Sequence, residues 1–241
     1  MQAQRDVQLR VDRIVRWIQQ QVAAAGAAGG VVGISGGIDS SVVASLCHRA
    51  LGGQALGLIL PCHSLARDLE DARRVARGVG IRTEELDLSK SYDGLISLLP
   101  PAGELPRANL KPRLRMLTLY YCANGRNLLV VGASNGAELA VGYFTKFGDG
   151  GADLLPIGAL LKGEVQQLAR VLGIPQRIMD KPPSAGLWEG QTDEEEMGIT
   201  YEELDRFLSG GEVPSPVAQR IRNLTEQSGH KRRPPLIFEE V

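Results

Sequence analysis

The residues of this sequence that could do chemistry begin with one run near its amino end: Gly33, Ile34, Ser35, Gly36, Gly37, Ile38, Asp39 and Ser40. The run follows an apolar stretch and precedes a helical pattern, so we expect a turn between a buried strand and a helix. Gly36 and Gly37 would let backbone N–H groups approach a polyphosphate, and the first N–H groups of the helix would complete the cradle. Asp39 would then bind Mg²⁺. An ordinary helix start, capped by Ser35 or Asp39, is the alternative.

Two common phosphate-binding loops do not match this run. The loop of kinases and GTPases needs a lysine that reaches the phosphates, and no lysine occurs before Lys90. The dinucleotide-binding fingerprint needs a second glycine two positions after the first, where Ser35 stands after Gly33. The run therefore predicts a different kind of nucleotide site.

A second acidic residue, Glu138, follows the apolar run 128–132. If both runs are strands of one parallel sheet, Glu138 would lie near the same edge as Asp39, and two carboxylates beside a triphosphate suit Mg²⁺. Glu138 could instead be an early-helix acid favoured by the helix dipole. The glycine-rich stretch 142–153 then brings Lys146, Asp149 and Asp153 close together in the sequence.

These residues must be positioned by the elements between them. Short apolar runs predict strands at 30–34, 55–60, 83–88 and 128–132, and helical patterns occupy 4–25, 40–51, 66–79, 89–99 and 109–124. Alternation of strands and helices favours a doubly wound parallel α/β sheet flanked by helices, in which ligands bind at the carboxyl ends of the strands. The apolar stripe of the first helix must pack either on this sheet or on a second subunit.

Composition limits the functional classes. The 241 residues, 43% hydrophobic, suit a single domain over 1–241, and 27 basic against 28 acidic residues leave no electrostatic footprint for nucleic acid. Cys47, Cys62 and Cys122 are widely separated, which argues against a structural zinc site and fits a reducing compartment. We find no membrane-spanning or signal-like stretch and expect a cytoplasmic protein without a membrane partner.

The run from Ser35 to Ser40 resembles the S-G-G-x-D-S loop of the ATP pyrophosphatase family, whose members split ATP between its α and β phosphates. The block at 142–153, G-Y-F-T-K-F-G-D-G-G-A-D, and the stretch 181–188 resemble one branch, the ammonia-dependent NAD synthetases. The likeness extends over about 11–238. It implies a Rossmann-like sheet of the adenine nucleotide alpha hydrolase type, built as a single domain.

The resemblance also implies which residues bind each substrate. ATP would be bound by the run from Gly33 to Ser40, with Ala133, Lys162 and Ser184, and Mg²⁺ by Asp39 and Glu138. Deamido-NAD would be bound by Arg113, Lys146, Asp153, His230 and Lys231. The sequence departs from the family at Ala133, where a threonine is usual, and near Ile59, where an arginine close to the adenine is common.

The implied reaction is amidation of deamido-NAD by free ammonia at the expense of ATP, through an acyl adenylate. Catalysis would depend on Lys162, which neutralises phosphate charge, and on Asp149, which we expect to accept a proton from ammonium. Since the acyl adenylate hydrolyses readily, 186–191 and the segment around His230 are expected to be mobile covers. The family is typically homodimeric, and the helices at 4–25 and 109–124 offer candidate faces.

Two other classes share part of this pattern. A GMP-synthetase-like or tRNA-thiolating pyrophosphatase would have the phosphate loop but lack the glycine-rich block at 142–153. A non-catalytic adenine nucleotide sensor would have the glycine turn without a reason to combine Asp39, Glu138 and Lys162.

Overall fold

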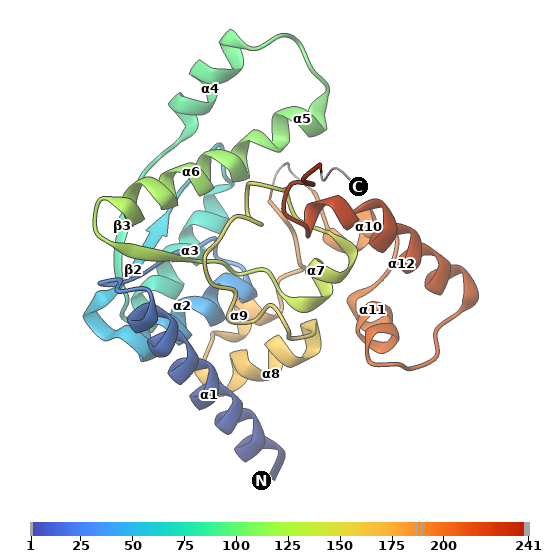
Figure 1. The fold of residues 1–241 in the computed structure, drawn as a ribbon, viewed down its shortest axis with the longest axis horizontal. Coiled ribbons are helices and arrows are strands. Elements are labelled where there is room, and N and C mark those ends of the chain that lie inside the picture. The colour runs from blue at the N-terminus through green and yellow to red at the C-terminus, as the bar shows by residue number, and fades with distance from the viewer. Residues whose placement is uncertain (1, 187, 189, 239–241) are drawn as a thin grey trace.

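A four-stranded parallel sheet lies at the centre of the chain (Figure 1). The computed structural model describes residues 2–186, 188 and 190–238. The strands are β1 (Gly29–Gly33), β2 (Ala55–Ile59), β3 (Arg82–Glu85) and β4 (Leu128–Val131), in the order β3-β2-β1-β4. The chain adds β2 and then β3 on one side of β1, and β4 on the other side of β1. The predicted doubly wound sheet is therefore confirmed, and its switch point lies between β1 and β4.

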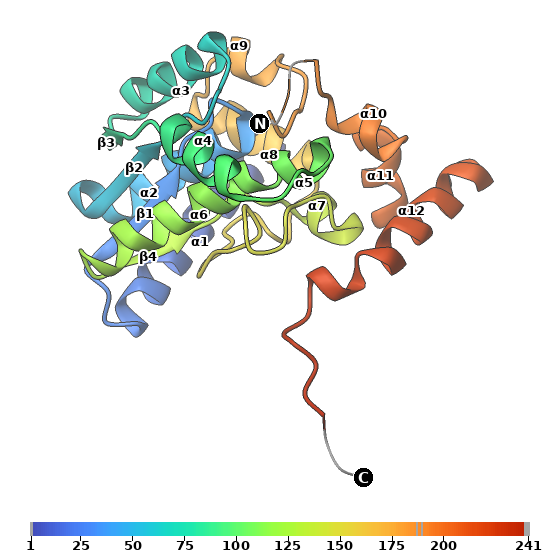
Figure 2. The same cartoon turned by 90° about the horizontal axis from the view of Figure 1, so that it is seen from above.

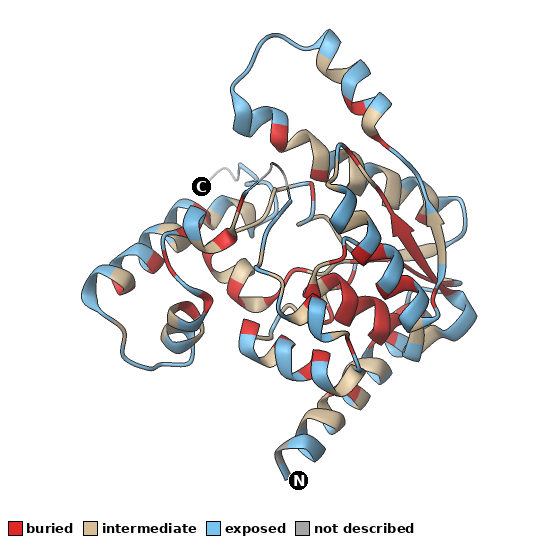
Figure 3. Cartoon of the chain, turned by 180° about the vertical axis from the view of Figure 1, so that it is seen from behind, coloured by how far each residue is buried: buried red, intermediate tan, exposed pale blue. Residues whose placement is uncertain are grey.

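Helices cover both faces of the sheet (Figure 2). Alternate side chains of each strand point to opposite faces, so Val32 joins one core cluster and its neighbour Val31 joins the other. The first face packs against α1 (Gln2–Ala24), α2 (Ile38–Leu51), α3 (Ala66–Val79) and α8 (Lys162–Leu172), and the second against α4 (Ser89–Leu98) and α6 (Leu110–Asn124). Figure 3 shows β1, β2 and α2 among the most continuously buried elements.

The boundaries agree with the sequence patterns to within a few residues, with two differences. The predicted strand at 83–88 ends as β3 at Glu85, although the N–H groups of Leu86 and Leu88 still donate to carbonyls at the end of β2 and just beyond it. A short helix that the patterns did not indicate, α5 (Glu104–Ala108), precedes α6. Its five residues are too few for a helical period to be recognised.

A third, smaller cluster lies beside the sheet and combines one helix from the middle of the chain with helices from its carboxyl-terminal third. It joins α7 (Gly136–Val141) to α11 (Tyr201–Leu208) and α12 (Ser215–Gln227). The remaining elements are α9 (Gln176–Met179), α10 (Asp193–Met197) and the 3₁₀ turns η1 (Gly52–Gln54) and η2 (Gly229–Lys231). The tail Pro234–Phe238 leaves this cluster in an extended conformation, as its prolines predict (Figure 2).

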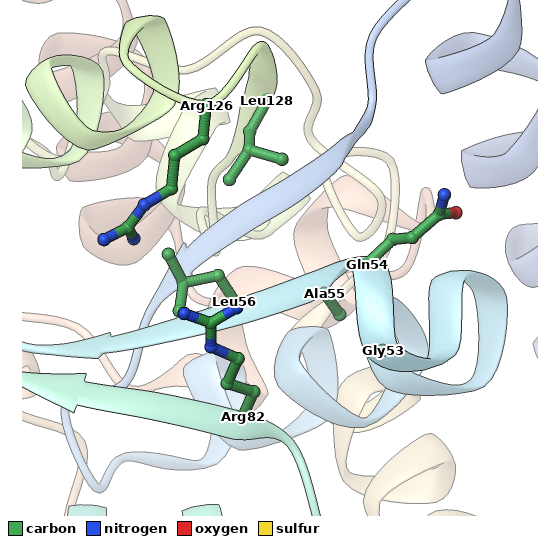
Figure 4. Close-up of a pocket in the computed structure, with 7 residues that line it drawn as sticks. All are labelled: Gly53, Gln54, Ala55, Leu56, Arg82, Arg126 and Leu128. Carbon is green, nitrogen blue, oxygen red and sulfur yellow. The ribbon is translucent and has the colours of Figure 1, made fainter.

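The two edges of the sheet differ in character. A pocket of about 270 Å³ opens at the amino-terminal edge, between the starts of β2 and β4, and is lined by Gly53, Gln54, Ala55, Leu56, Arg82, Arg126 and Leu128 (Figure 4). The buried charged residues lie at the opposite, carboxyl-terminal edge, where parallel α/β sheets bind ligands. In the described part of the chain, no helix has the length and apolar character needed to cross a membrane.

Candidate active site

The glycine turn after β1 forms an open loop whose shape depends on Gly36. This residue has a φ of 81°, and a Cβ there would lie 2.6 Å from the carbonyl oxygen of Asp68 in α3. The hydroxyls of Ser35 and Ser40 lie 3.0 Å apart and tie the two ends of the loop together. No side chain caps α2, which begins after Gly37. The alternative of Asp39 as an ordinary helix cap is therefore wrong, and the first N–H groups of α2 remain available to an anion.

Asp39 instead points to a buried ammonium group. The Nζ of Lys162, the first residue of α8, lies 2.6 Å from Oδ2 of Asp39 and 3.6 Å from Oε1 of Glu138. Lys162 is only 3% exposed, and its carboxylate partners are mostly buried as well. The structure thus brings together three predicted site residues from α2, α7 and α8 at the switch point of the sheet.

Asn135 joins the two carboxylates. Its side-chain amide donates to Oδ1 of Asp39 at 3.1 Å and to Oε1 of Glu138 at 2.7 Å. It also caps α7 by accepting the N–H of Glu138 at 3.0 Å, while Oε2 of Glu138 accepts the N–H of Asn135. The helix-start interpretation of Glu138 is therefore correct too, because one carboxyl oxygen serves the capping box and the other faces Lys162.

The protonation of these groups is strongly coupled. Burial and the neighbouring Asp39 carboxylate raise the pKa of Glu138, since two buried negative charges repel one another. Burial alone would lower the pKa of Lys162, but the Asp39 and Glu138 carboxylates outweigh burial and raise it. The site therefore holds Lys162 charged and favours any additional positive charge.

The donor set fits a magnesium ion shared with a nucleotide. Two carboxylates already face one buried cation, the Lys162 ammonium, so the site accommodates positive charge. Among the described residues, no group of three or more His, Cys, Asp or Glu side chains converges as a metal-binding cluster would require. Mg²⁺ is commonly held by one or two carboxylates together with substrate phosphates and water, which matches this arrangement.

A second group of predicted residues gathers around the glycine-rich loop. Lys146 donates through Nζ to the carbonyl of His230 at 2.6 Å, and Arg113 on α6 donates to the carbonyl of Lys146 at 3.3 Å. Lys231 donates to the carbonyls of Gly142 and Phe144 at 2.8 and 2.9 Å. The loop and η2, the turn that follows α12, are thus held together, although 84 residues separate Lys146 from His230.

Close packing explains the glycines of this loop. A Cβ on Gly150 would lie 2.4 Å from the Phe144 ring, and one on Gly151 would lie 2.9 Å from Met116 of α6. The loop folds back on Asp149, whose Oδ1 accepts the N–H of Thr145 at 2.9 Å. Asp149 is therefore fixed in orientation while it remains exposed to solvent.

Three predicted residues lie apart from these two groups. Asp153 accepts the N–H of Val130 at 2.7 Å and the hydroxyl of Tyr120 at 2.9 Å, which anchors the loop to β4. Ser184 is exposed and accepts the N–H of Gly186. Ala133 is partly buried and packs on the core. The expected mobility of 186–191 remains a prediction, since 187 and 189 lie outside the described residues; His230 belongs to η2.

Sequence reasoning missed several residues that contact Lys162. The Tyr201 ring lies beneath its ammonium, with 4.7 Å from Nζ to the ring centroid, and Asp205 accepts its backbone N–H at 3.1 Å. Asp193 in turn accepts the hydroxyl of Tyr201. No local motif marks Tyr201 and Asp205, because each contacts Lys162 from about 40 positions away in the sequence.

The family to which this arrangement belongs follows from comparison with known proteins. The family model of the NAD synthases matches residues 10–235, nearly the whole chain. The chain belongs to the NAD synthase family. Among its relatives is the NH(3)-dependent NAD(+) synthetase of Alkaliphilus metalliredigens, 48% identical over 96% of this chain and 98% of that protein. The enzyme of the same name from Carboxydothermus hydrogenoformans is 47% identical, over 94% and 95% of the two chains.

Solved structures of similar proteins share the fold over almost their full length. The NMN synthetase of Francisella tularensis superposes with a TM-score of 0.93 at 39% identity, covering 97% of this chain and 99% of that one. The NH3-dependent NAD synthetase of Campylobacter jejuni, solved with a nitrate ion, gives a TM-score of 0.83 at 28% identity with the same coverage. The expected resemblance to this branch is confirmed.

Proposed function

We infer that this chain is an ammonia-dependent NAD synthetase, a ligase that amidates deamido-NAD with ATP as co-substrate. The observation that carries the inference is the convergence of Asp39, Glu138 and Lys162 beside an open phosphate loop, in a chain that matches the NAD synthase family over residues 10–235. Relatives named NH(3)-dependent NAD(+) synthetase at 47–48% identity support the substrates.

The reaction proceeds in two steps. The nicotinate carboxylate of deamido-NAD attacks the α phosphorus of ATP, which forms an acyl adenylate and expels pyrophosphate. Ammonia then attacks the acyl carbon, a proton leaves the nitrogen, and AMP departs as NAD forms. Negative charge must be neutralised, because in the first step a carboxylate approaches a polyphosphate.

The chain supplies this neutralisation from its own groups. The N–H groups at the start of α2 and the loop from Gly33 to Ser40 bind phosphate oxygens, and the Lys162 ammonium faces the pyrophosphate that leaves. Ala133 and Ser184 complete the nucleotide site. Asp39 and Glu138 would hold Mg²⁺, which supplies further positive charge to the phosphates when it is bound.

The acceptor lies beside the glycine-rich loop. Arg113 of α6, Lys146 of the loop itself and Lys231 of η2 bring positive charge that suits the phosphates of a dinucleotide, and His230 of η2 lies beside Lys146. Asp153 adds a polar group at the β4 side. Closure of 186–191 and of the segment around His230 over the acyl adenylate would exclude water.

Asp149 accepts the proton that ammonium must lose. Its orientation is fixed by the N–H of Thr145, and one oxygen of an asparagine could keep that hydrogen bond. Asp149→Asn should therefore retain ATP–pyrophosphate exchange with deamido-NAD while NAD formation falls by about 10²-fold or more. Undiminished NAD formation in this variant would refute the role of Asp149.

One assay tests the function as a whole. The wild-type chain is incubated with ATP, Mg²⁺, ammonium and deamido-NAD, and NAD, AMP and pyrophosphate are quantified. Equal amounts of the three products are expected. Pyrophosphate with a different acceptor would indicate another AMP-forming pyrophosphatase, and ATP binding without turnover would indicate a nucleotide sensor. Replacing ammonium by glutamine is expected to abolish the reaction in the absence of a partner.

A second acceptor is favoured by one observation, the TM-score of 0.93 with the NMN synthetase of Francisella tularensis. Nicotinate mononucleotide carries the same reacting carboxylate as deamido-NAD and lacks only the adenylate half. The ratio of kcat/KM for the two acceptors, measured in competition, decides between them. We propose deamido-NAD as the preferred acceptor because relatives at 47–48% identity carry the NAD synthetase name.

We further propose that the chain acts as a homodimer, with residues 1–241 as one catalytic domain. Most of the apolar stripe of α1 packs within the chain against α2 and α8, so we propose α6, the other candidate helix, as the contact face. On α6, Leu117 and Tyr121 are 61% and 79% exposed and lie one turn apart on the same face. Sedimentation of the wild-type chain should give a dimer, and Leu117→Glu should give a monomer.

A further inference from the structure

A helix of the third cluster, α11, contacts Lys162 at both its side chain and its backbone. We propose that Tyr201 and Asp205 are positioning residues, which hold Lys162 toward the nucleotide phosphates independently of its two carboxylate partners. The proposal rests on the proposed function, because it assigns α11 a role in binding ATP. Tyr201 and Asp205 are four residues apart and therefore share one face of α11.

The ring of Tyr201 packs against the ammonium group of Lys162. Tyr201 is 5% exposed, and the Nζ of Lys162 lies 4.7 Å from the ring centroid. Such a contact is strongest when both groups are removed from water, as they are here. The hydroxyl of Tyr201 fixes the ring by donating to Oδ2 of Asp193 at 3.0 Å, with Oε1 of Glu138 as a second acceptor at 3.4 Å.

Asp205 fixes the backbone from which Lys162 extends. Its two oxygens accept the N–H groups of Lys162 at 3.1 Å and of Gly163 at 2.7 Å. These N–H groups open α8 and have no partner within their own helix, and the residue before them, Leu161, cannot cap it through its side chain. A carboxylate from another helix therefore acts as the cap and sets where α8 begins.

The two contacts matter because Asp39 and Glu138, the ion-pair partners of Lys162, are also the proposed ligands of a metal ion. Asp39 and Glu138 attract the ammonium at 2.6 and 3.6 Å as long as they are free. A cation that neutralises these carboxylates weakens both ion pairs at the moment when Lys162 must face the phosphates. The cap by Asp205 involves neither carboxylate, and the ring of Tyr201 is also fixed by its shorter hydrogen bond to Asp193, so both still direct Lys162.

The proposal is tested by nucleotide binding rather than by turnover alone. The affinity of a non-hydrolysable ATP analogue with Mg²⁺ is measured by calorimetry for wild type, Tyr201→Phe, Tyr201→Leu and Asp205→Ala, together with the KM for ATP and for deamido-NAD. Loss of the ring in Tyr201→Leu should weaken the analogue by about tenfold or more, as expected for a desolvated cation–π contact. Tyr201→Phe keeps the ring and should remain within about threefold of wild type.

The KM values distinguish positioning from general damage. We expect KM for ATP to rise in Tyr201→Leu and in Asp205→Ala, while KM for deamido-NAD stays unchanged. Phe207→Leu is the matched control, because it removes a ring from the same helix, one that lies 5.7 Å from the Arg222 guanidinium and outside the charged cluster. This variant should bind the analogue as wild type does.

Each outcome decides a separate question. Equal analogue affinity in wild type, Tyr201→Leu and Asp205→Ala overturns the positioning role. If Tyr201→Leu does not fold, the test rests on Asp205→Ala and Tyr201→Phe. Loss of measurable analogue binding in Tyr201→Phe would show that the effect does not come from the ring. Absence of NAD formation by wild type overturns the proposed function instead, and the analogue affinities then still report on Tyr201 and Asp205.

Discussion

Removal of the buried ammonium gives the sharpest test of the charged cluster. Lys162→Met replaces the side chain by an apolar one of similar length, which leaves Asp39 and Glu138 as two buried carboxylates without a cation. Breaking a buried ion pair on one side costs about 3–5 kcal/mol, since the remaining charge stays desolvated. We expect the variant to fold with lower stability in the absence of metal.

The loss converts directly into a melting temperature. A chain of 241 residues has an unfolding entropy of about 0.5 kcal/mol/K, taken at about 2.1 cal/mol/K per residue. The expected loss therefore lowers Tm by about 6–10 °C in EDTA at neutral pH.

Magnesium should restore part of this stability. The ion would compensate the two carboxylates, so its addition should raise Tm more in Lys162→Met than in wild type. Lys181→Met is the matched control, because Lys181 also faces two aspartates, Asp68 at 2.7 Å and Asp71 at 3.4 Å, away from the proposed metal ligands. Scanning calorimetry of the three proteins with and without Mg²⁺ makes the measurement. An unchanged Tm in Lys162→Met, with the same magnesium response as wild type, would refute the reasoning.

Three further outcomes are expected. The pKa of Glu138 is raised in the folded state, so the folded chain keeps a proton that the unfolded chain loses as pH rises above about 4.3, and the folded state loses stability. In EDTA, Glu138→Gln, which cannot ionise, should therefore gain Tm relative to wild type between pH of about 5 and about 8. A constant difference in Tm would contradict this. Asp153→Ala should lose about 1–2 kcal/mol in urea unfolding because it leaves the buried N–H of Val130 in β4 without its acceptor, and Tyr120→Phe, which removes one hydrogen bond to the same carboxylate, should lose less. The reverse order would be inconsistent with these hydrogen bonds. Gly36→Ala should lose about 2 kcal/mol or more, since its Cβ would meet a carbonyl at 2.6 Å at positive φ, whereas Gly53→Ala, with nothing within 4 Å, should be neutral by the same measurement.

Much of the fold could be predicted because its signals are local. The helix at 66–79 agrees with α3 at both ends, where an amphipathic pattern stops at Gly80 in the left-handed conformation. The glycine turn after β1 was recognisable from residue types alone. Strand β3 was overestimated at its carboxyl end, since an edge strand is bounded by its pairing partner rather than by its own residues.

The candidate site was predictable only in part. Asp39 and Glu138 lie in the first turns of the helices that follow β1 and β4, so parallel topology was enough to bring them to one edge. Asn135, Tyr201 and Asp205 were not predictable as site residues, because their roles depend on packing between elements that the sequence does not connect. Asp153, expected beside the substrate, is engaged by β4 and Tyr120, which no local pattern could indicate.

The sequence by itself determined the parallel sheet, the phosphate loop and the family, because hydrophobic period, glycine turns and a specific glycine-rich block are properties of neighbouring residues. Only the tertiary structure decided how the charges are balanced. Whether Lys162 is buried between Asp39 and Glu138, and what holds it there, depends on the angle at which α8 and α11 meet the sheet edge. Electrostatic interactions depend on distance and burial in three dimensions, and neither is encoded in the spacing of residues along the chain.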